Sequence, residues 1–249
     1  MEALRTDDLQ PFVKERIVPF FQEILEKTAP NLHSLYIVGS ALTGDFIEKV
    51  SDINSIIVLK EMDLAFLDLL APMGRKYRKQ RLAAPLTLTP DSIQNSLDVF
   101  PIEFLGFRLN HHTIWGEDLL AGLKIGKGDL KRQCEREIKS KLIWLRRGYV
   151  SAAGDKNTLA QNIIRPFTGY IPLFRAIIYL LNQPPPAPVG QVLSELEKLT
   201  GADTAVLKEI YAIKKHRLKP SKDELSGIFA RFYQATAKLG EIIDGLQVS

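Results

Sequence analysis

Hydrophobic positions in the first part of the chain follow two spacings, one typical of helices and one typical of strands. Over residues 8–27 the apolar side chains recur every three or four positions, which predicts an amphipathic helix. A short apolar run at residues 35–38 ends at Gly39-Ser40, as a buried strand does when it enters a tight turn. A second run, residues 53–59, is rich in branched side chains and predicts another strand.

The same alternation continues further along the chain. Residues 63–79 are expected to form a helix, residues 84–89 a third strand and residues 100–107 a fourth strand. Between the last two, Thr89-Pro90-Asp91 supplies an N-cap residue and a proline at the first helical position, so a short helix should begin there. Alternating helices and strands predict an α/β sheet domain over residues 1–128.

The pattern changes after Gly126-Lys127-Gly128. Helical periodicity predicts five helices, over residues 129–153, 157–182, 189–199, 204–217 and 221–246. A proline-rich stretch at residues 184–188 should be a stiff connector between two of them. Residues 129–249 are therefore expected to form an all-α helical bundle domain.

Charge is distributed unevenly between these two parts. The 249-residue chain has a net charge of +4, but residues 1–128 carry 14 basic and 17 acidic side chains, and residues 129–249 carry 19 and 12. A net charge of +7 on the second part could attract phosphate-bearing ligands or nucleic acid. Solvated helix faces are the simpler interpretation, because runs of charge usually have that origin.

Cysteine content and hydropathy indicate the compartment. Cys134 is the single cysteine, so the chain can form neither an internal disulfide nor a zinc cluster built on cysteines. The first ten residues are acidic and lack the apolar stretch of a signal peptide. The most apolar segment, residues 171–181, is too short to cross a bilayer and contains Arg175. These features predict a cytoplasmic protein with no membrane partner.

The segment between the first two predicted strands carries the chemical signal. Gly39 and Ser40 end one strand, and Asp52 and Asn54 stand at the start of the next. A glycine lets the backbone approach a triphosphate, and free N–H groups of a helix that begins there would point at the phosphates. Residues i and i+2 of a strand share a face, so the side chains of Asp52 and Asn54 should project together.

A further acidic side chain comes from the predicted fourth strand. Glu103 lies in an apolar run on the face opposite Phe100, Ile102 and Phe104. A buried unpaired carboxylate is costly, and neighbouring metal ions would offset that cost. Asp98 is the weaker candidate because it precedes the expected strand.

Together these residues resemble the signature of nucleotidyltransferases of the DNA polymerase β superfamily. That signature is Gly-Ser, a spacer of about a dozen residues, Asp-x-Asp on a strand and a third carboxylate on a later strand. The resemblance covers residues 32–120. It implies an α/β (α+β) nucleotidyltransferase fold with a mixed sheet, followed by an all-α helical bundle, as in the two-domain plan of kanamycin-type nucleotidyltransferases.

The resemblance also implies an activity and a site. A nucleoside monophosphate would move from a nucleoside triphosphate, most simply ATP, to a hydroxyl of a small molecule, a protein or an RNA. Gly39 and Ser40 would hold the phosphates, and Asp52, Asn54 and Glu103 would hold Mg²⁺, with Glu103 also accepting the proton of the acceptor hydroxyl. Asn54 departs from the family's second aspartate, which weakens metal binding and leaves the chain suited to a single Mg²⁺ ion.

Other polar clusters have simpler interpretations. His111-His112 should point in opposite directions on an extended segment, a poor arrangement for zinc. Glu117 and Asp118 are expected to cap the next helix, and His216 to lie at a helix C-terminus. The basic run at residues 74–81 also ends a helix, although it could bind polyphosphate or RNA. Arg165, Tyr170 and Arg175 are either cleft residues or packing and surface residues.

Two other classes of function stay open. The chain could be a catalytically degenerate nucleotide sensor or interaction protein that has kept the cleft and lost the chemistry. It could instead be a nucleic-acid-binding module that uses the basic helices, which would require a basic groove lined with aromatic side chains.

Overall fold

A computed structural model describes residues 3–47 and 50–247 of the chain. They form two compact units. The first comprises the chain up to Leu97 together with Phe104–Lys124, and the second comprises Asp98–Glu103 together with the chain from Ile125 onward. The domain boundary after residue 128 stays a prediction.

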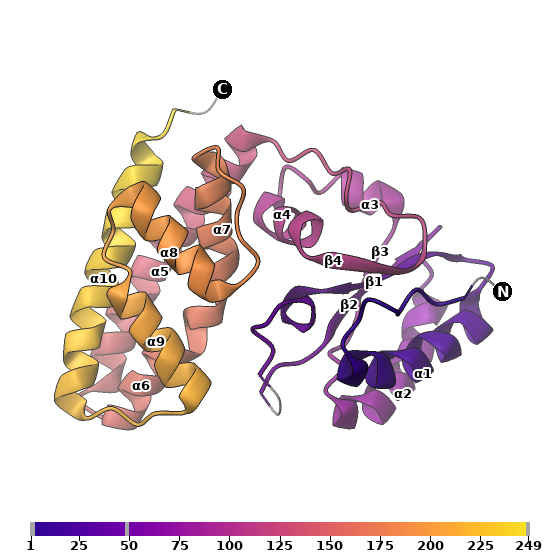
Figure 1. Cartoon of the computed structure of the whole chain (residues 1–249), viewed down its shortest axis with the longest axis horizontal. Helices are drawn as coiled ribbons and strands as arrows, with labels where there is room; N and C mark the ends of the chain where they lie inside the picture. The colour runs from indigo at the N-terminus through magenta and orange to yellow at the C-terminus, as the bar shows by residue number, and fades with distance from the viewer. Residues whose placement is uncertain (1–2, 48–49, 248–249) are drawn as a thin grey trace. The chain divides into compact units, whose positions relative to one another are not determined.

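The first unit is built on a four-stranded sheet in the order β3-β2-β1-β4 (Figure 1). The central strand β1 (Leu32–Val38) pairs antiparallel with β2 (Asn54–Leu59) and with β4 (His111–Gly116), and β2 pairs parallel with β3 (Leu86–Leu88). The sheet is therefore mixed, as predicted.

Two helices, α1 (Pro11–Thr28) and α2 (Leu64–Tyr77), cover one face of this sheet (Figure 1). Their apolar sides share one hydrophobic core with β1 and β2, in which Phe21, Ile37 and Ile57 are fully buried. The short helix α3 (Pro90–Gln94) lies on the other side of the sheet and begins where the sequence predicted, with a capping box between Thr89 and Ser92.

The prediction of the fourth strand was wrong. Residues 100–107 belong largely to a helix, α4 (Pro101–Leu109), and the fourth strand follows it as β4. Proline is well tolerated at the first helical position, and the buried side chains of Ile102 and Leu105 are spaced three apart, as one helix face requires. The alternation of Ile102 and Phe104 had suggested a strand because residues two apart share a strand face.

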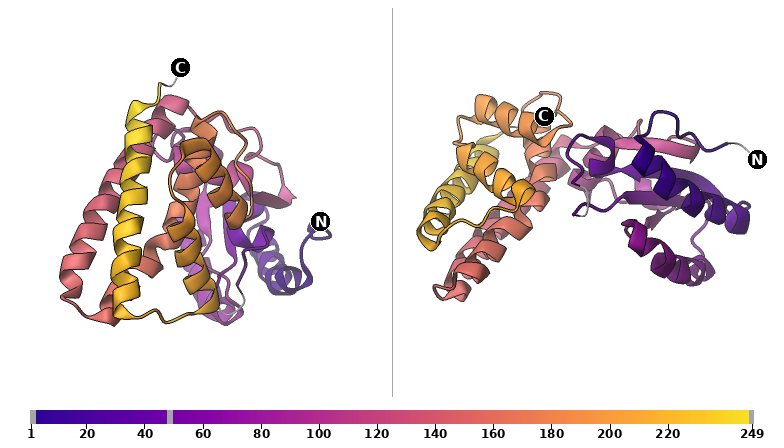
Figure 2. Two further views of the ribbon diagram at one scale, coloured as in Figure 1. Left: turned by 60° about the vertical axis from the view of Figure 1, so that its left-hand side comes forward. Right: turned by 60° about the horizontal axis from the view of Figure 1, so that its bottom comes forward.

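The second unit is helical, and its described residues from 125 to 247 contain no strand. Its elements are α5 (Lys127–Ala152), α6 (Lys156–Ile164), the 3-10 helix η3 (Arg165–Tyr170), α7 (Ile171–Leu180), α8 (Val189–Thr200), α9 (Ala205–His216) and α10 (Lys222–Gly245). The two longest helices, α5 and α10, lie side by side (Figure 2). Together with the mixed sheet, this confirms the predicted fold class.

The long helix expected over residues 157–182 is divided by η3. Pro166 and Pro172 lack the N–H groups that a continuous α-helix would need there. The whole stretch Lys156–Leu180 is long and apolar enough to cross a membrane by length and composition, but 56% of its most apolar window is buried inside the protein. The core helix of a soluble protein has the same properties, and the cytoplasmic location stays a prediction.

Candidate functional site

The turn after β1 depends on a glycine. Gly39 has a φ of +82°, a left-handed conformation that side chains other than glycine adopt at a cost. Its N–H donates to the carbonyl of Asn110 at 3.2 Å. One turn of 3-10 helix, η1 (Gly39–Leu42), follows in place of a longer helix, and the Ser40 carbonyl accepts from the N–H of Thr43 at 3.2 Å.

Asn54 lies beside this turn. It pairs with Val38 across the β1–β2 ladder, so the first residue of β2 faces the last residue of β1. A methyl group built on Gly39 would lie 3.7 Å from Nδ2 of Asn54, in ordinary van der Waals contact. The structure therefore brings the Gly39-Ser40 turn and Asn54 together.

Asp52, two residues before the start of β2, is exposed on the same side of the chain as Asn54. Ile53, between them, is 1% exposed and belongs to the core shared with α1 and α2. Because successive side chains of an extended segment point to opposite faces, Asp52 and Asn54 both project away from that core.

Asp52 has a partner that the sequence did not reveal. Nε of Arg81 lies 3.0 Å from Oδ1 of Asp52, and the same guanidinium donates to the carbonyls of Ser51, at 3.4 Å, and Val50. Backbone pairing explains the placement, since the N–H of Ile53 donates to the Arg81 carbonyl at 2.8 Å and Ile53 bridges Leu82 in parallel. The Asp52 carboxylate is therefore already paired with a cation.

The remainder of the basic run at residues 74–81 is explained partly by structure. Nζ of Lys76 lies 2.7 Å from Oε2 of Glu23 on α1 and 4.9 Å from the ring centroid of Tyr77. Hydrogen bonds from Lys27, Lys76 and Tyr77 lower the pKa of Glu23 to about 2. These contacts join α2 to α1 and leave Arg75, Arg78 and Lys79 exposed.

Glu103, predicted on a strand, lies in the first turn of α4 and is grouped with the second unit. Its Oε2 accepts a hydrogen bond from Nε2 of Gln133 at 2.8 Å, and Oε1 of Gln133 accepts from the N–H of Ile102 at 2.7 Å. Gln133 is buried, so it holds both the start of α4 and the Glu103 carboxylate against α5. The role of Glu103 as an acid near Asp52 stays a prediction.

The neighbouring thiol on α5 is sealed from solvent. Cys134 is 0% exposed, and burial raises the pKa of its thiol far above the ordinary value. Carboxylates of Glu137, Glu135 and Glu103 raise it further.

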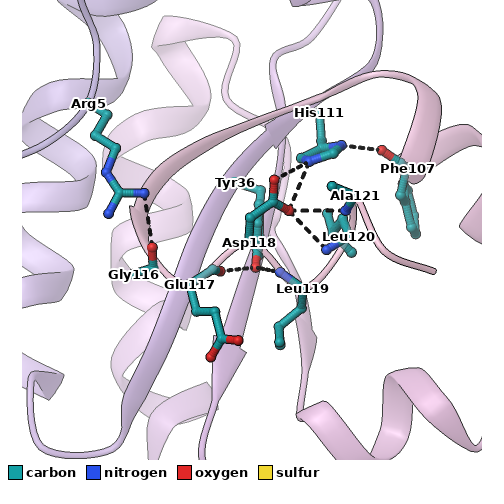
Figure 3. Close-up of polar contacts among 10 residues, drawn as sticks. All are labelled: Arg5, Tyr36, Phe107, His111, Gly116, Glu117, Asp118, Leu119, Leu120 and Ala121. Carbon is teal, nitrogen blue, oxygen red and sulfur yellow. Dashed lines mark hydrogen bonds and ion pairs between the residues drawn. The ribbon is translucent and has the colours of Figure 1, made fainter.

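A second polar network lies at the same end of β1 (Figure 3). His111 pairs with Val38 on the side of β1 opposite Asn54. Its Nδ1 lies 2.8 Å from the carbonyl of Phe107, and its Nε2 lies 3.0 Å from Oδ1 of Asp118. Both partners are acceptors, so both bonds form together only when both ring nitrogens carry a hydrogen.

Asp118 and Tyr36 fix the turn that follows β4. Oδ1 of Asp118 accepts from the N–H groups of Leu120 and Ala121 at 3.0 and 3.1 Å (Figure 3). These residues form a turn, and the next helix begins only at Lys127, so the predicted helix cap is instead a cap of this turn. The Tyr36 hydroxyl donates to the Glu117 carbonyl at 2.5 Å and accepts from the N–H of Leu119 at 3.0 Å. Burial raises the pKa of Tyr36.

The pKa of Asp118 reflects two opposing effects. Burial raises it, but the bonds from His111 and from the N–H groups of Ala121 and Leu120 outweigh burial and bring it below the ordinary value. The sequence marks His111 only as a weak candidate for a metal ligand. Its carboxylate partner is seven residues away, on the far side of a strand, which no local motif marks.

Metal ligands are sparse at this site. Among the described residues, no three His, Cys, Asp or Glu side chains are gathered so that they could hold a metal ion. The first unit offers the carboxylate of Asp52 and the amide oxygen of Asn54, which suit a hard cation but lack the charge for two ions. Because Arg81 already contacts Asp52, these two oxygens could contribute to the ligands of one Mg²⁺ ion at most.

Comparison with known proteins adds a likeness to solved structures. No family model matches the chain, and no curated protein matches it. The structure is similar to spectinomycin adenyltransferase AAD(9) from Enterococcus faecialis, solved with ATP and spectinomycin, with a TM-score of 0.39 and 14% identity over 87% of this chain and 98% of that chain. Since identity and TM-score are low, support for a function has to come from the side chains of this chain.

Proposed function

We propose that this chain is a nucleotidyltransferase of the polymerase β type, which moves a nucleoside monophosphate from a nucleoside triphosphate to a hydroxyl acceptor. The observation that carries the proposal is the juxtaposition of the Gly39-Ser40 turn with Asn54 at the adjoining ends of β1 and β2. Asp52, two residues before Asn54, is exposed on the same side of the chain. A backbone turn open to phosphate beside projecting oxygen ligands is what this chemistry requires. ATP is the simplest donor.

Each residue has a defined part in the proposed reaction. Gly39 lets the triphosphate approach the backbone, and the Ser40 hydroxyl donates to a phosphate oxygen. Oxygens of Asp52 and Asn54 would hold a Mg²⁺ ion, which would supply positive charge at the α-phosphate. The acceptor oxygen would bond to the α-phosphorus, the bond to the β-phosphate oxygen would break, pyrophosphate would leave, and the hydroxyl proton would pass to a base, the part that the resemblance implies for Glu103.

Asn54 is expected to make this reaction slow. Its amide gives a neutral oxygen where a carboxylate would add charge, so affinity for a second ion falls. Little transfer by the natural chain is therefore expected.

The ion pair between Arg81 and Asp52 favours a second candidate, a nucleotide sensor without transferase activity. At 3.0 Å the guanidinium neutralises the Asp52 carboxylate, and its remaining N–H groups could bind a triphosphate without a metal ion. In that case the chain would bind nucleotide and change its partners without transferring anything.

Calorimetric titration with ATP distinguishes these candidates. The full chain is titrated in Mg²⁺ and in EDTA, with Asp52→Ala measured in parallel. Binding that requires Mg²⁺ and Asp52 supports the transferase. Binding that persists in EDTA supports the sensor, and an absence of binding under both conditions would refute both candidates.

A further inference from the structure

The second unit contains a pocket of its own, between α5, α6 and η3. Its volume is about 680 Å³, within the range that small-molecule ligands occupy. All its lining residues lie between Lys141 and Tyr170, so none of them is Gly39, Ser40, Asp52 or Asn54. The pocket therefore goes beyond the proposed transfer site.

Positive charge dominates the lining of this pocket. Lys141, Arg147 and Arg165 contribute three cations, and no lining residue among those described is Asp or Glu. Lys141 has one carboxylate neighbour, Glu137, at 3.4 Å. In the described part of the chain neither arginine has a carboxylate within ion-pair distance, so two guanidinium groups are available to an anion.

An exposed aromatic ring stands beside these cations. Trp144 is 66% exposed, although tryptophan side chains are large and on average mostly buried. The guanidinium of Arg147 lies 5.1 Å from its ring centroid, which keeps the positive group next to the indole face. The ring of Tyr170, by contrast, is buried, and Nζ of Lys141 lies 4.7 Å from its centroid.

Neutral hydrogen-bonding groups complete the lining. Ser151 and Gln161 offer a hydroxyl and an amide, and Asn162 already donates to the Gly148 carbonyl at 2.8 Å, which ties α6 to α5. Groups of this kind can bind the sugar hydroxyls and base edges of a nucleotide, as the guanidinium groups bind its phosphate.

We propose that this pocket binds a nucleotide, with the phosphate held by Arg147 and Arg165 and the base stacked on Trp144. Phosphate and a flat ring are the two chemical features that match paired guanidinium groups and an exposed indole. A cationic acceptor such as an aminoglycoside would be repelled by the same three cations. The nucleotide can be free or can be one unit of a single-stranded nucleic acid.

Tryptophan fluorescence tests the assignment directly. The chain has two tryptophans, so Trp115→Phe leaves Trp144 as the only one. This full-length protein is titrated in EDTA with AMP, with adenosine and with a single-stranded oligonucleotide of about eight nucleotides. Saturable quenching by AMP and a much weaker effect of adenosine are expected, because the phosphate supplies the charge contact.

Variants locate the ligand within the pocket. Arg147→Ala and Arg165→Ala should each raise the Kd for AMP about tenfold, the ratio that one charged hydrogen bond supplies. Arg146→Ala is the matched control, since it removes an exposed arginine from α5 that does not line the pocket. It should change the Kd by less than about twofold. Melting temperatures confirm that each variant is folded.

The remaining arms identify the source of the nucleotide and separate the two sites. Tighter binding of the oligonucleotide than of AMP supports a single strand as the ligand, and equal or weaker binding supports a free nucleotide. Gly39→Ala should leave the quenching unchanged. Loss of quenching in that variant, equal quenching by adenosine, no quenching by any probe, or an unchanged Kd in both arginine variants would overturn the proposal.

Discussion

The guanidinium of Arg81 lies 3.0 Å from the carboxylate of Asp52 and also donates to the carbonyls of Ser51 and Val50. Arg81 therefore holds in place the segment that leads into β2. It also competes for the oxygen that a metal ion would use. The two effects can be separated by mutation.

Arg81→Ala should release Asp52 and tighten Mg²⁺-dependent binding of ATP, while binding in EDTA weakens. Stability should fall by only about 1 kcal/mol, because the pair is partly exposed and its hydrogen bonds are few. Calorimetry with and without Mg²⁺, together with urea unfolding, measures both effects. Arg78→Ala removes an exposed arginine from the same run and serves as the control. Weaker Mg²⁺-dependent binding in Arg81→Ala would mean that Arg81 itself contacts the phosphates.

Asn54→Asp should raise nucleotidyl transfer, because a second carboxylate on the Asp52 face adds the charge that two ions require. Asp52→Ala should abolish whatever transfer the natural chain performs. Release of label from α-labelled ATP, with melting temperatures measured alongside, tests both variants. If the natural chain is more active than Asn54→Asp, the Asn54 amide does not impair transfer. A sensor would gain metal affinity without transfer.

Gly39→Ala should destabilise the protein by about 1–2 kcal/mol, the cost of a left-handed conformation for a residue with a side chain. The added methyl group meets Asn54 only at 3.7 Å, so strain in the backbone accounts for the loss. Gly44→Ala is the control, because its φ is not positive and a methyl group there would meet nothing within 4 Å. Urea unfolding should show a clear loss for Gly39→Ala alone.

Asp118 should make stability depend on pH in acid. Its pKa is lowered in the folded protein, so the carboxylate contributes stability fully above its unfolded pKa of about 3.9, and that contribution is lost as pH falls through the folded pKa. Asp118→Asn should therefore melt below the natural chain at pH 7, and the gap should close below about pH 4.

Melting temperatures between pH 7 and pH 3 measure this gap. Glu117→Gln is the matched control, because the side chain of Glu117 is 71% exposed. Its Oε2 makes one long ion-pair contact, 3.6 Å from Nε2 of His33. A gap between Asp118→Asn and the natural chain that stays constant with pH would contradict the assignment.

Local patterns in the sequence were sufficient to predict the elements around the turn. The apolar run before Gly39, the branched residues after Asn54 and the capping residues at Thr89 each act within a few positions, and the structure contains the corresponding strand, strand and helix. The common face of Asp52 and Asn54 could be predicted because side chains two apart on an extended segment point the same way.

Contacts distant in sequence could not be predicted in the same way. Arg81 reaches Asp52 because β2 continues a parallel pairing at Ile53 and Leu82, and that pairing is set by the sheet as a whole. Residues around Glu103 were ambiguous, because short apolar runs fit either period and tertiary packing decides between them. Gln133, thirty residues away, supplies the partner that holds this segment as a helix start.

The buried thiol of Cys134 has a practical consequence for following the second unit. Only a thiolate reacts readily with alkylating reagents, and burial keeps this sulfur protonated and out of reach on α5. Alkylation would therefore occur only in molecules whose helices have separated around α5. The rate at which the protein gains the mass of one label therefore measures how often the second unit opens, without a probe built into the chain.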